Sequence, residues 1–214
     1  MSHEITPEMF EQPSWDERYG GPGRVWSGRA NAVLAAEAAG LVPGRAVDLG
    51  CGEGGDAIWL AEHGWQVTGI DFSEAGLARA AAHAAERGVA DRVEWRQADL
   101  RAWTPAGADG VEQWDLVTSH FLHLLDDGML EATREMARAV APGGTLLVVG
   151  HHPDDEHTGL RWSMPGVLFT AEGLGVALHP DLFDVHVEAR QREEVRDGVA
   201  HQVTDAVLRA RRRD

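Results

Sequence analysis

The sequence contains no lysine, one cysteine and one tyrosine, and it lacks a long apolar run. A lone cysteine, Cys51, excludes an internal disulfide and fits a reducing compartment. No apolar segment stands near the amino terminus, and none reaches the roughly 20 residues of a membrane-spanning helix, so we expect a cytoplasmic protein without a membrane partner. The missing lysines, in a chain rich in alanine, glycine and arginine, reflect genome composition more than function.

Positive charge is scarce as well. All 19 basic residues are arginines, and they face 35 acids, which gives a formal net charge of −16. Since phosphate contacts need a basic surface, this balance disfavours DNA or RNA as a partner, although it leaves room for a local basic patch. With 214 residues and 43% hydrophobic content, the chain is long enough for one sizeable core. We expect one domain over residues 29–214, an arm over residues 1–28, and a monomer or homodimer.

A glycine-rich turn stands between an apolar strand pattern and a helical pattern. The predicted strand covers residues 45–49, the glycines follow, and the helical pattern begins at Asp56. Glycine allows tight turns and lets a ligand touch the backbone, and free N–H groups at the start of a helix favour a carboxylate or phosphate. This order is typical of the first half of a nucleotide-binding unit. A glycine turn that binds no ligand is the structural alternative.

Two spacings coexist in this turn. Gly50, Gly52 and Gly55 match the dinucleotide pattern, whereas Gly50, Gly52 and Gly54 follow an acid, Asp48. Such an acid would repel a pyrophosphate, so it favours a zwitterionic nucleoside cofactor. Here the chain resembles the class I S-adenosylmethionine-dependent methyltransferases, whose first motif has the form acid-x-Gly-x-Gly-x-Gly. The resemblance implies cofactor contacts from the motif residues Asp48, Gly50, Cys51 and Gly52.

An acid also ends the second predicted strand, residues 65–70. Asp71 lies roughly 20 residues past the glycines, where it could accept both ribose hydroxyls of a nucleoside. Dinucleotide-binding proteins use the same device, so Asp71 does not separate the two cofactors. Its alternative role is to cap the next helix, although Ser73 is better positioned for that. Phe72 follows Asp71 and joins the predicted cofactor site.

The third predicted strand leads into Ala98-Asp99-Leu100. The resemblance implies that Asp99 accepts a hydrogen bond from the adenine amine and that Leu100 lies beside it; an exposed aspartate that opens a turn is the alternative. Ser119, at the end of the fourth predicted strand, joins the cofactor site in the same way. A Pro-Gly-Gly turn before the apolar fifth strand is another landmark of the family, and the resemblance covers about residues 30–150.

These landmarks predict the α/β fold class: a single Rossmann-like domain with a seven-stranded, mostly parallel sheet, an antiparallel last strand and helices on both faces. In the carboxyl-terminal part, residues 182–187 and 202–209 are predicted strands, and residues 192–198 are the predicted reverse turn between them. We see no internal repeat and no linker that would add a second domain.

Aromatic residues are concentrated in the arm, which proline and glycine interrupt. Trp15, Tyr19 and Trp26 are unusual in a disordered tail, so part of the arm should fold back onto the domain. Packing on the sheet edge is one interpretation, and a lid over the cofactor is the other. The tellurite-resistance and thiopurine-methyltransferase-like groups carry a similar arm with a Trp-Asp-x-x-Tyr start, which implies cofactor contacts from these three residues.

The resemblance implies methyl transfer from S-adenosylmethionine to a sulfur, oxygen or nitrogen atom of a small molecule, by in-line displacement that leaves S-adenosylhomocysteine. Cys51 lies inside the glycine turn, which argues against a covalent cysteine mechanism, and the Asn/Asp-Pro-Pro-Tyr motif of nucleic-acid amino-methyltransferases is missing. A nicotinamide-dependent oxidoreductase is the alternative, although the chain has no Tyr-x-x-x-Lys pair. A module that binds the cofactor without catalysis is a third interpretation.

Four histidines follow strands that neighbour each other in this fold. His120 and His123 follow the fourth strand, and His151 and His152 follow the fifth, so we expect them to meet beside the transferred methyl group. They could line the site, act as a general base or orient the acceptor, or bind a metal. His120 or His151 is the predicted catalytic residue. No metal is predicted, because only His120 and His123 have a helical ligand spacing.

Overall fold

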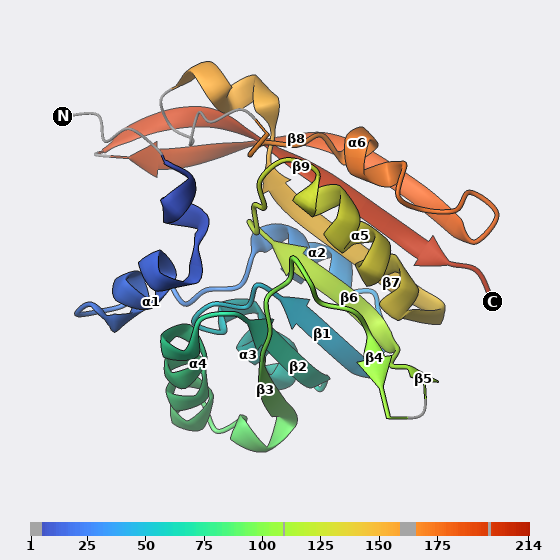
Figure 1. Ribbon diagram of the computed structural model, residues 1–214, viewed down its shortest axis with the longest axis horizontal. Coiled ribbons are helices and arrows are strands. Elements are labelled where there is room, and N and C mark those ends of the chain that lie inside the picture. The colour runs from blue at the N-terminus through green and yellow to red at the C-terminus, as the bar shows by residue number, and fades with distance from the viewer. Residues whose placement is uncertain (1–5, 109, 159–165, 197) are drawn as a thin grey trace.

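A computed structural model describes residues 6–108, 110–158, 166–196 and 198–214 (Figure 1). Its centre is a seven-stranded sheet of β1 (Arg45–Leu49), β2 (Gln66–Asp71), β3 (Val93–Gln97), β6 (Trp114–His120), β7 (Val140–His151), β8 (Phe183–Arg196) and β9 (Val199–Arg212). Their order across the sheet is β3-β2-β1-β6-β7-β9-β8. The strands from β3 to β7 run parallel, and β9 is antiparallel to both of its neighbours. This topology confirms the predicted fold class.

Helices cover both faces of the sheet (Figure 1). One face packs against α2 (Ala32–Ala38), α3 (Gly55–Glu62) and α4 (Glu74–Glu86), and the other against α5 (Gly128–Ala139) and α6 (Ala171–Gly175). Side chains alternate along a strand, so neighbours in β1 serve opposite faces: Ala46 joins the core with α2 and α3, and Val47 joins the core with α5. Among the helices of the described ranges, none is long and apolar enough to cross a membrane.

Polar side chains set where two of these helices begin. The side-chain oxygen of Asn31 accepts hydrogen bonds from the N–H groups of Val33 and Leu34, at the start of α2. The hydroxyl of Ser73 accepts a hydrogen bond from the Gly76 N–H at 3.0 Å and caps α4. Such caps satisfy N–H groups that have no partner inside the helix. The capping role expected for Ser73 is confirmed.

The carboxyl-terminal strands form a longer hairpin than the sequence predicts. β8 and β9 pair as far as Arg196 and Val199, so residues 192–196 continue the strand and do not form the predicted turn. Arg192 bonds the Asp205 carboxylate across the hairpin at 2.6 Å, an interaction that a reading of each strand alone does not reveal. A second, short hairpin, β4 (Ala106–Gly107) with β5 (Gly110–Val111), has no counterpart in the sequence prediction.

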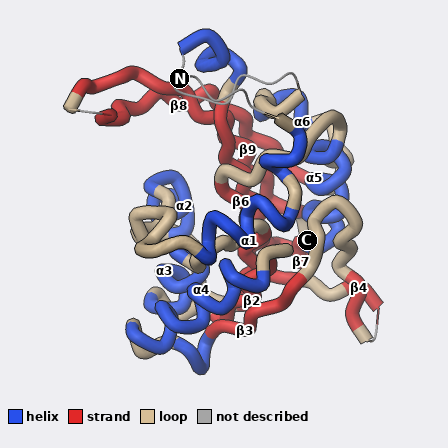
Figure 2. Tube along the Cα trace, turned by 60° about the vertical axis from the view of Figure 1, so that its left-hand side comes forward, coloured by secondary structure: helices blue, strands red, loops and turns tan. Residues whose placement is uncertain are grey.

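The arm folds back onto the domain. Its helix α1 (Gln12–Gly20) packs beside α4, and its 3₁₀ turn η1 (Pro7–Phe10) precedes α1 and contacts it (Figure 2). Phe10 and Tyr19 are buried, so these aromatic residues of the arm are part of the packed structure. Further 3₁₀ turns are η2 (Ala90–Arg92), before β3, and η3 (Pro153–Thr158), after β7.

Candidate functional site

The glycine turn connects the end of β1 to the start of α3. Gly50, Gly52 and Gly54 have φ angles of +77°, +50° and +81°, in the left-handed region that favours glycine. A Cβ atom on Gly52 would lie 2.6 Å from the Tyr19 hydroxyl, and one on Gly54 would lie 2.7 Å from the Trp95 ring. The turn therefore requires the three glycines of the acid-x-Gly-x-Gly-x-Gly spacing.

Asp71, at the end of β2, holds this turn in place. Its Oδ2 accepts a hydrogen bond from the Gly52 N–H at 2.8 Å, and its Oδ1 accepts one from the Ser73 N–H at 2.9 Å. Asp71 is 6% exposed, and burial raises the pKa of its carboxyl. Each carboxylate oxygen can accept a second hydrogen bond, so Asp71 keeps acceptor capacity for a ligand.

Behind the turn, two carboxylates and an imidazole meet. Asp48 lies on β1, Asp56 in the first turn of α3 and His120 at the end of β6, and their donor atoms all lie within 4.8 Å of one another. The His120 Nδ1 lies 2.9 Å from the Asp56 Oδ2. Burial, together with the nearby Asp56, raises the pKa of Asp48 well above its usual range. Such donors could also hold a divalent cation, which the sequence spacing did not predict.

The four histidines do not meet as the sequence predicts. β6 continues through His120, so its imidazole follows Thr118 onto the face that packs against α3, where only 3% of it is exposed. His152 donates its backbone N–H to the Thr204 carbonyl on β9 and is buried. The expectation of one shared rim is therefore wrong for His120.

His123 and His151 do come together. Their rings stack at a centroid distance of 5.1 Å and an interplanar angle of 15°. The His123 Nδ1 lies 2.8 Å from the Val167 carbonyl, so this nitrogen carries the hydrogen and donates it. The opposite nitrogen, Nε2, accepts the His151 backbone N–H at 3.4 Å. Phe121 packs on the His151 ring at 4.6 Å, which holds that ring between two aromatic neighbours.

Other predicted cofactor residues have protein partners of their own. The Asp99 carboxylate binds the Arg101 guanidinium at 2.7 Å, and this hydrogen bond lowers the pKa of Asp99. The Ser119 hydroxyl donates to the Leu49 carbonyl at 2.7 Å, and Leu100 is buried in the core shared with α5. The side chains of Ser119 and Leu100 therefore contact the core, and their part in the cofactor site stays a prediction. Phe72 is half-buried beside Asp71.

The arm contacts the glycine turn directly. The Tyr19 hydroxyl accepts a hydrogen bond from the Trp26 indole N–H at 3.2 Å and lies against Gly52. The Trp15 ring packs near both, with ring centroids 5.6 Å from Tyr19 and 6.2 Å from Trp26. Burial raises the pKa of the Tyr19 phenol, which therefore stays protonated. The aromatic residues predicted to cover the cofactor are thus assembled over the turn.

Two residues that sequence reasoning missed anchor this arm. Glu53, inside the turn, is 5% exposed, and its Oε2 accepts the backbone N–H groups of Val25 and Trp26 at 3.0 Å each. Arg79 on α4 binds the other oxygen, Oε1, at 2.9 Å. Glu53 could have been suspected, because a charged residue between two glycines of a tight turn needs a partner. Its distance of 26 residues from Arg79 gives no local signal.

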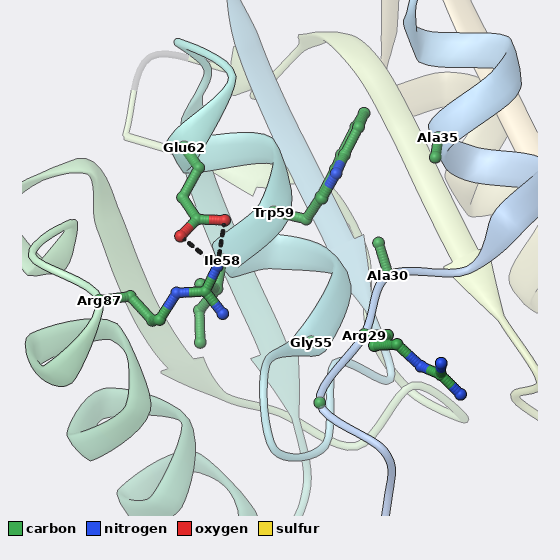
Figure 3. Close-up of a pocket in the computed structure, with 9 residues that line it drawn as sticks. Arg29, Ala30, Ala35, Gly55, Ile58, Trp59, Glu62 and Arg87 are labelled. Carbon is green, nitrogen blue, oxygen red and sulfur yellow. Dashed lines mark hydrogen bonds and ion pairs between the residues drawn. The ribbon is translucent and has the colours of Figure 1, made fainter.

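A separate hollow of about 320 Å³ lies on the outer side of α3 (Figure 3). Arg87 faces Glu62 there and binds it at 2.6 Å, while the Arg29 side chain points away from that pair. No predicted site residue lines this hollow, whose lining consists of Gly28, Arg29, Ala30, Ala35, Gly55, Ile58, Trp59, Glu62 and Arg87. The residues predicted to bind the cofactor and to catalyse the reaction therefore lie outside this hollow.

Residues 46–144 match the family model described as a methyltransferase domain. Over these residues, a little under half of the chain, the protein is similar to a methyltransferase domain, which supports the resemblance to the class I S-adenosylmethionine-dependent methyltransferases. It is 35% identical over 124 residues to a trans-aconitate 2-methyltransferase of Streptomyces avermitilis, across 56% of this chain and 44% of the relative. It is also 35% identical over 106 residues to a ubiquinone biosynthesis O-methyltransferase of a Caulobacter species, across 49% and 39%. The chain thus spans less than half of each of these relatives.

Solved structures share the fold at low sequence identity. TehB from Haemophilus influenzae is 18% identical with a TM-score of 0.66, covering 94% of this chain and 66% of the other. The N-methyltransferase NodS from Bradyrhizobium japonicum, solved with S-adenosylhomocysteine, is 20% identical with a TM-score of 0.70, covering 95% and 98%. The [4+2]-cyclase SpnF has the same fold, at 23% identity and a TM-score of 0.65 over 99% of each chain. Chemistry must therefore be argued from the site.

Proposed function

We propose that this protein transfers a methyl group from S-adenosylmethionine to a small molecule and releases S-adenosylhomocysteine. The observation that carries the proposal is the Gly52–Asp71 hydrogen bond at the carboxyl edge of β1 and β2, inside the matched methyltransferase domain. Open α/β sheets bind ligands at this edge, and the positive φ angles leave the backbone of the turn accessible to a ligand.

The residues at this edge fit the cofactor's charge. S-adenosylmethionine carries a sulfonium and an ammonium group, and Asp48 and Asp71 are buried acids whose pKa values burial raises. Within the part of the chain that the structure describes, neither acid forms an ion pair with an arginine. A bound cation would offset the cost of burying them. Asp99 would release Arg101 and would then accept a hydrogen bond from the adenine amine.

The cofactor supplies a methyl group on a sulfonium, ready for in-line displacement. The chain's residues orient the two reactants and exclude water, which contributes about 7–11 kcal/mol when the alignment is close. We assign His151 as the general base that takes the proton of a hydroxyl, thiol or amine acceptor, because His123 and Phe121 hold its ring in one orientation. The His120 side chain is buried against Asp56, so we do not assign His120 as the general base.

A small-molecule acceptor agrees with the relatives and with the charge. The relatives are named for trans-aconitate and ubiquinone biosynthesis, and the net charge of −16 disfavours a nucleic acid. Tyr19, the single tyrosine, is packed against Gly52, and the chain has no lysine, so the nicotinamide-dependent alternative lacks its usual acid. A cytoplasmic location and a monomer or homodimer stay predictions.

Calorimetric titration with S-adenosylmethionine and with NADH tests the cofactor. We expect S-adenosylmethionine to bind, and Asp71→Ala to weaken its binding by one to two orders of magnitude, about the worth of two hydrogen bonds to a charged group. Asp71→Asn is the matched control, because it keeps the shape and removes the charge, and we expect an intermediate affinity. Binding of NADH, or unchanged affinity in folded Asp71→Ala, would contradict the assignment.

A methyl-transfer assay tests His151, with trans-aconitate, a polyphenol and an aryl thiol as trial acceptors. For a hydroxyl acceptor we expect His151→Gln to lower the rate by about a hundredfold and to remove the fall in rate at acidic pH, while cofactor affinity is unchanged. The control is His186→Gln, which replaces an exposed histidine on β8. Equal pH profiles in the two variants would leave His151 as a lining residue.

A further inference from the structure

The outer edge of β8 has no strand partner within the described residues. β8 contains 14 residues, whereas a strand usually has about five or six, and it pairs along its length with β9. β9 pairs with β7 only over residues 205–211, so the rest of the hairpin projects as a two-stranded ribbon (Figure 2). A long edge strand presents a row of backbone N–H and C=O groups, to which a strand of another chain can bind.

Charged side chains follow a particular order along β8. Every second residue from Asp184 to Arg196 is an acid, an arginine or a histidine, and these side chains share one face of the strand. Arg190 stands at their midpoint. Each acid of this series is matched by a basic residue at the same distance on the other side of Arg190, which gives the pairs Asp184 with Arg196, Glu188 with Arg192, and Glu194 with His186. A strand with this order is complementary to an antiparallel copy of itself.

We propose that β8 is a homodimer interface, in which the β8 strands of two copies pair antiparallel about a twofold axis at Arg190. Such an axis places odd-numbered residues opposite odd-numbered ones, so the outward N–H and C=O groups of one copy meet those of the other. It also places Val185 opposite Val195, side chains that are 44% and 65% exposed in the single chain. The two sheets join into one, and each projecting ribbon gains a neighbouring strand. The inference goes beyond the proposed function and does not depend on it.

The order of charges also selects this register. Moving the axis by one residue toward the start of β8 would place Asp184 opposite Glu194, and moving it by one residue toward the end would place Glu188 opposite Glu194. Like charges directly opposite each other in a strand pair are destabilising. An axis at Arg192 again opposes unlike charges, but it shortens the pairing to residues 188–196 and leaves Asp184 outside it.

The charges of β8 have partners within the chain, and these partners can be exchanged. Arg190 binds Glu188 at 2.7 Å, and Arg196 binds Glu194 at 2.8 Å, in each case between neighbours on one face of the strand. Such partly exposed pairs contribute little, so pairs across the interface can replace or join them. At the axis the two Arg190 side chains face each other, but each is bound by Glu188 and Glu37 of its own copy.

The balance of charge on β8 differs from that of the whole chain. The chain carries a net charge of −16, which makes two copies repel each other. β8 has four acids and three arginines, so it lacks this acidic excess and offers an edge that a second copy can approach. Charges on an edge strand can also serve to prevent pairing. Prevention works with charges in any order, whereas a match about Arg190 is required only by a strand that pairs with itself.

Charge reversal tests the interface, because neutralising one exposed pair would have little effect. Sedimentation equilibrium of the full chain in about 0.15 M salt, where long-range repulsion is screened, measures the dissociation constant. We expect the wild type to dimerise at concentrations up to about 100 μM. Asp184→Arg and Arg196→Asp should each raise the dissociation constant at least about tenfold, because like charges then meet at two symmetric positions. The variant with both changes should return to within about threefold of the wild type, because opposite charges face each other again.

A matched control and a distance measurement accompany these variants. Glu131→Arg makes the same change of charge as Asp184→Arg at an exposed acid on α5, and it should leave the dissociation constant within about threefold of the wild type. A spin label on Gln191→Cys lies next to the axis, and the native Cys51 is buried, so the new cysteine takes the label. We expect the two labels of a dimer to lie within about 25 Å of each other, because residues 191 of the two copies are diagonal neighbours.

Several results would overturn the inference. It fails if the wild type stays monomeric over the whole concentration range, or if neither single reversal weakens the dimer. A dissociation constant that the double variant does not restore rules out the axis at Arg190. A dimer whose labels lie far beyond the expected distance does the same, and this measurement needs no charge variant to fold. If S-adenosylmethionine does not bind, the proposed function fails and the dimer interface is unaffected.

Discussion

Two acid-rich regions of this molecule differ in the partners of their carboxylates. On the β8–β9 hairpin, acids face arginines: Arg190 binds Glu188 at 2.7 Å, and Arg192 binds Asp205 at 2.6 Å. At the glycine turn, Asp71 is held by two backbone N–H groups and no arginine is bound to it in the described part of the chain. Chain composition is therefore not the reason that Asp71 stands without an arginine partner.

This difference in how the carboxylates are paired corresponds to a difference in role, between stabilising the fold and binding a ligand. Exposed ion pairs such as Arg190–Glu188 help to fix the register of the hairpin and add little to its stability, whereas the pair with the buried Asp205 satisfies a carboxylate that could not otherwise be buried. Buried acids without a counter-ion lower stability, and proteins keep such groups where a ligand or a reaction uses them. The hairpin pairs its charges within the protein, whereas under the proposed function the turn gains stability when the cationic cofactor binds.

The largest loss of stability is expected from replacing Arg79, the arginine that binds an acid of the turn. Arg79→Met leaves the Glu53 carboxylate, 5% exposed, without its counter-ion and removes the donor to the carbonyl oxygens of Gly21 and Gly23. We expect the free energy of unfolding to fall by about 2–4 kcal/mol in urea titrations. Hydrogen exchange should also accelerate across residues 12–28 of the arm.

Arg138→Met is the control for this variant, because it breaks an exposed pair with Glu135 on α5. It should change the free energy of unfolding by less than about 0.5 kcal/mol. If both variants lose the same stability, Glu53 is not the anchor of the arm. Loss of stability without faster exchange in the arm would show that Arg79 serves α4 alone.

A smaller effect is expected from removing an acid that has no arginine. Burial raises the pKa of Asp48 above its unfolded value, so the folded protein binds the proton more tightly between these two pKa values. Stability that Asp48 provides below pH about 4 is therefore lost as pH rises toward its folded pKa. Asp48→Asn should match the wild type in thermal stability at pH about 4 and exceed it at pH 7. A variant that is less stable than the wild type at pH 7 would show that the charged form is needed for folding.

Local patterns predict the succession of strands along the chain and the glycine turn, because each depends on residues close in sequence. The acid-x-Gly-x-Gly-x-Gly spacing matches the three positive φ angles, and Ser73 caps α4 as predicted. The site's partners are harder to predict, because they join distant residues: Glu53 finds Arg79 on another helix, and His120 turns to Asp56 because β6 runs one residue further than its apolar pattern. The hairpin's length depends likewise on pairs across two strands.

The smallest effect is expected on the hairpin surface, where a carboxylate and its arginine are both open to water. Arg196 binds Glu194 at 2.8 Å, and 45% of the arginine side chain is exposed. Arg196→Gln should change the free energy of unfolding by less than about 0.5 kcal/mol, because water and salt screen the pair.

Arg192→Gln is the matched comparison on the same strand. Asp205 is 2% exposed, so the loss of its arginine partner should lower the free energy of unfolding by about 2 kcal/mol. Urea titrations of both variants, with cofactor titration alongside, should show unchanged affinity in each. Weaker binding of the cofactor in Arg192→Gln would mean that the hairpin and the turn are coupled, and that the contrast between a stabilising and a binding set of acids does not hold.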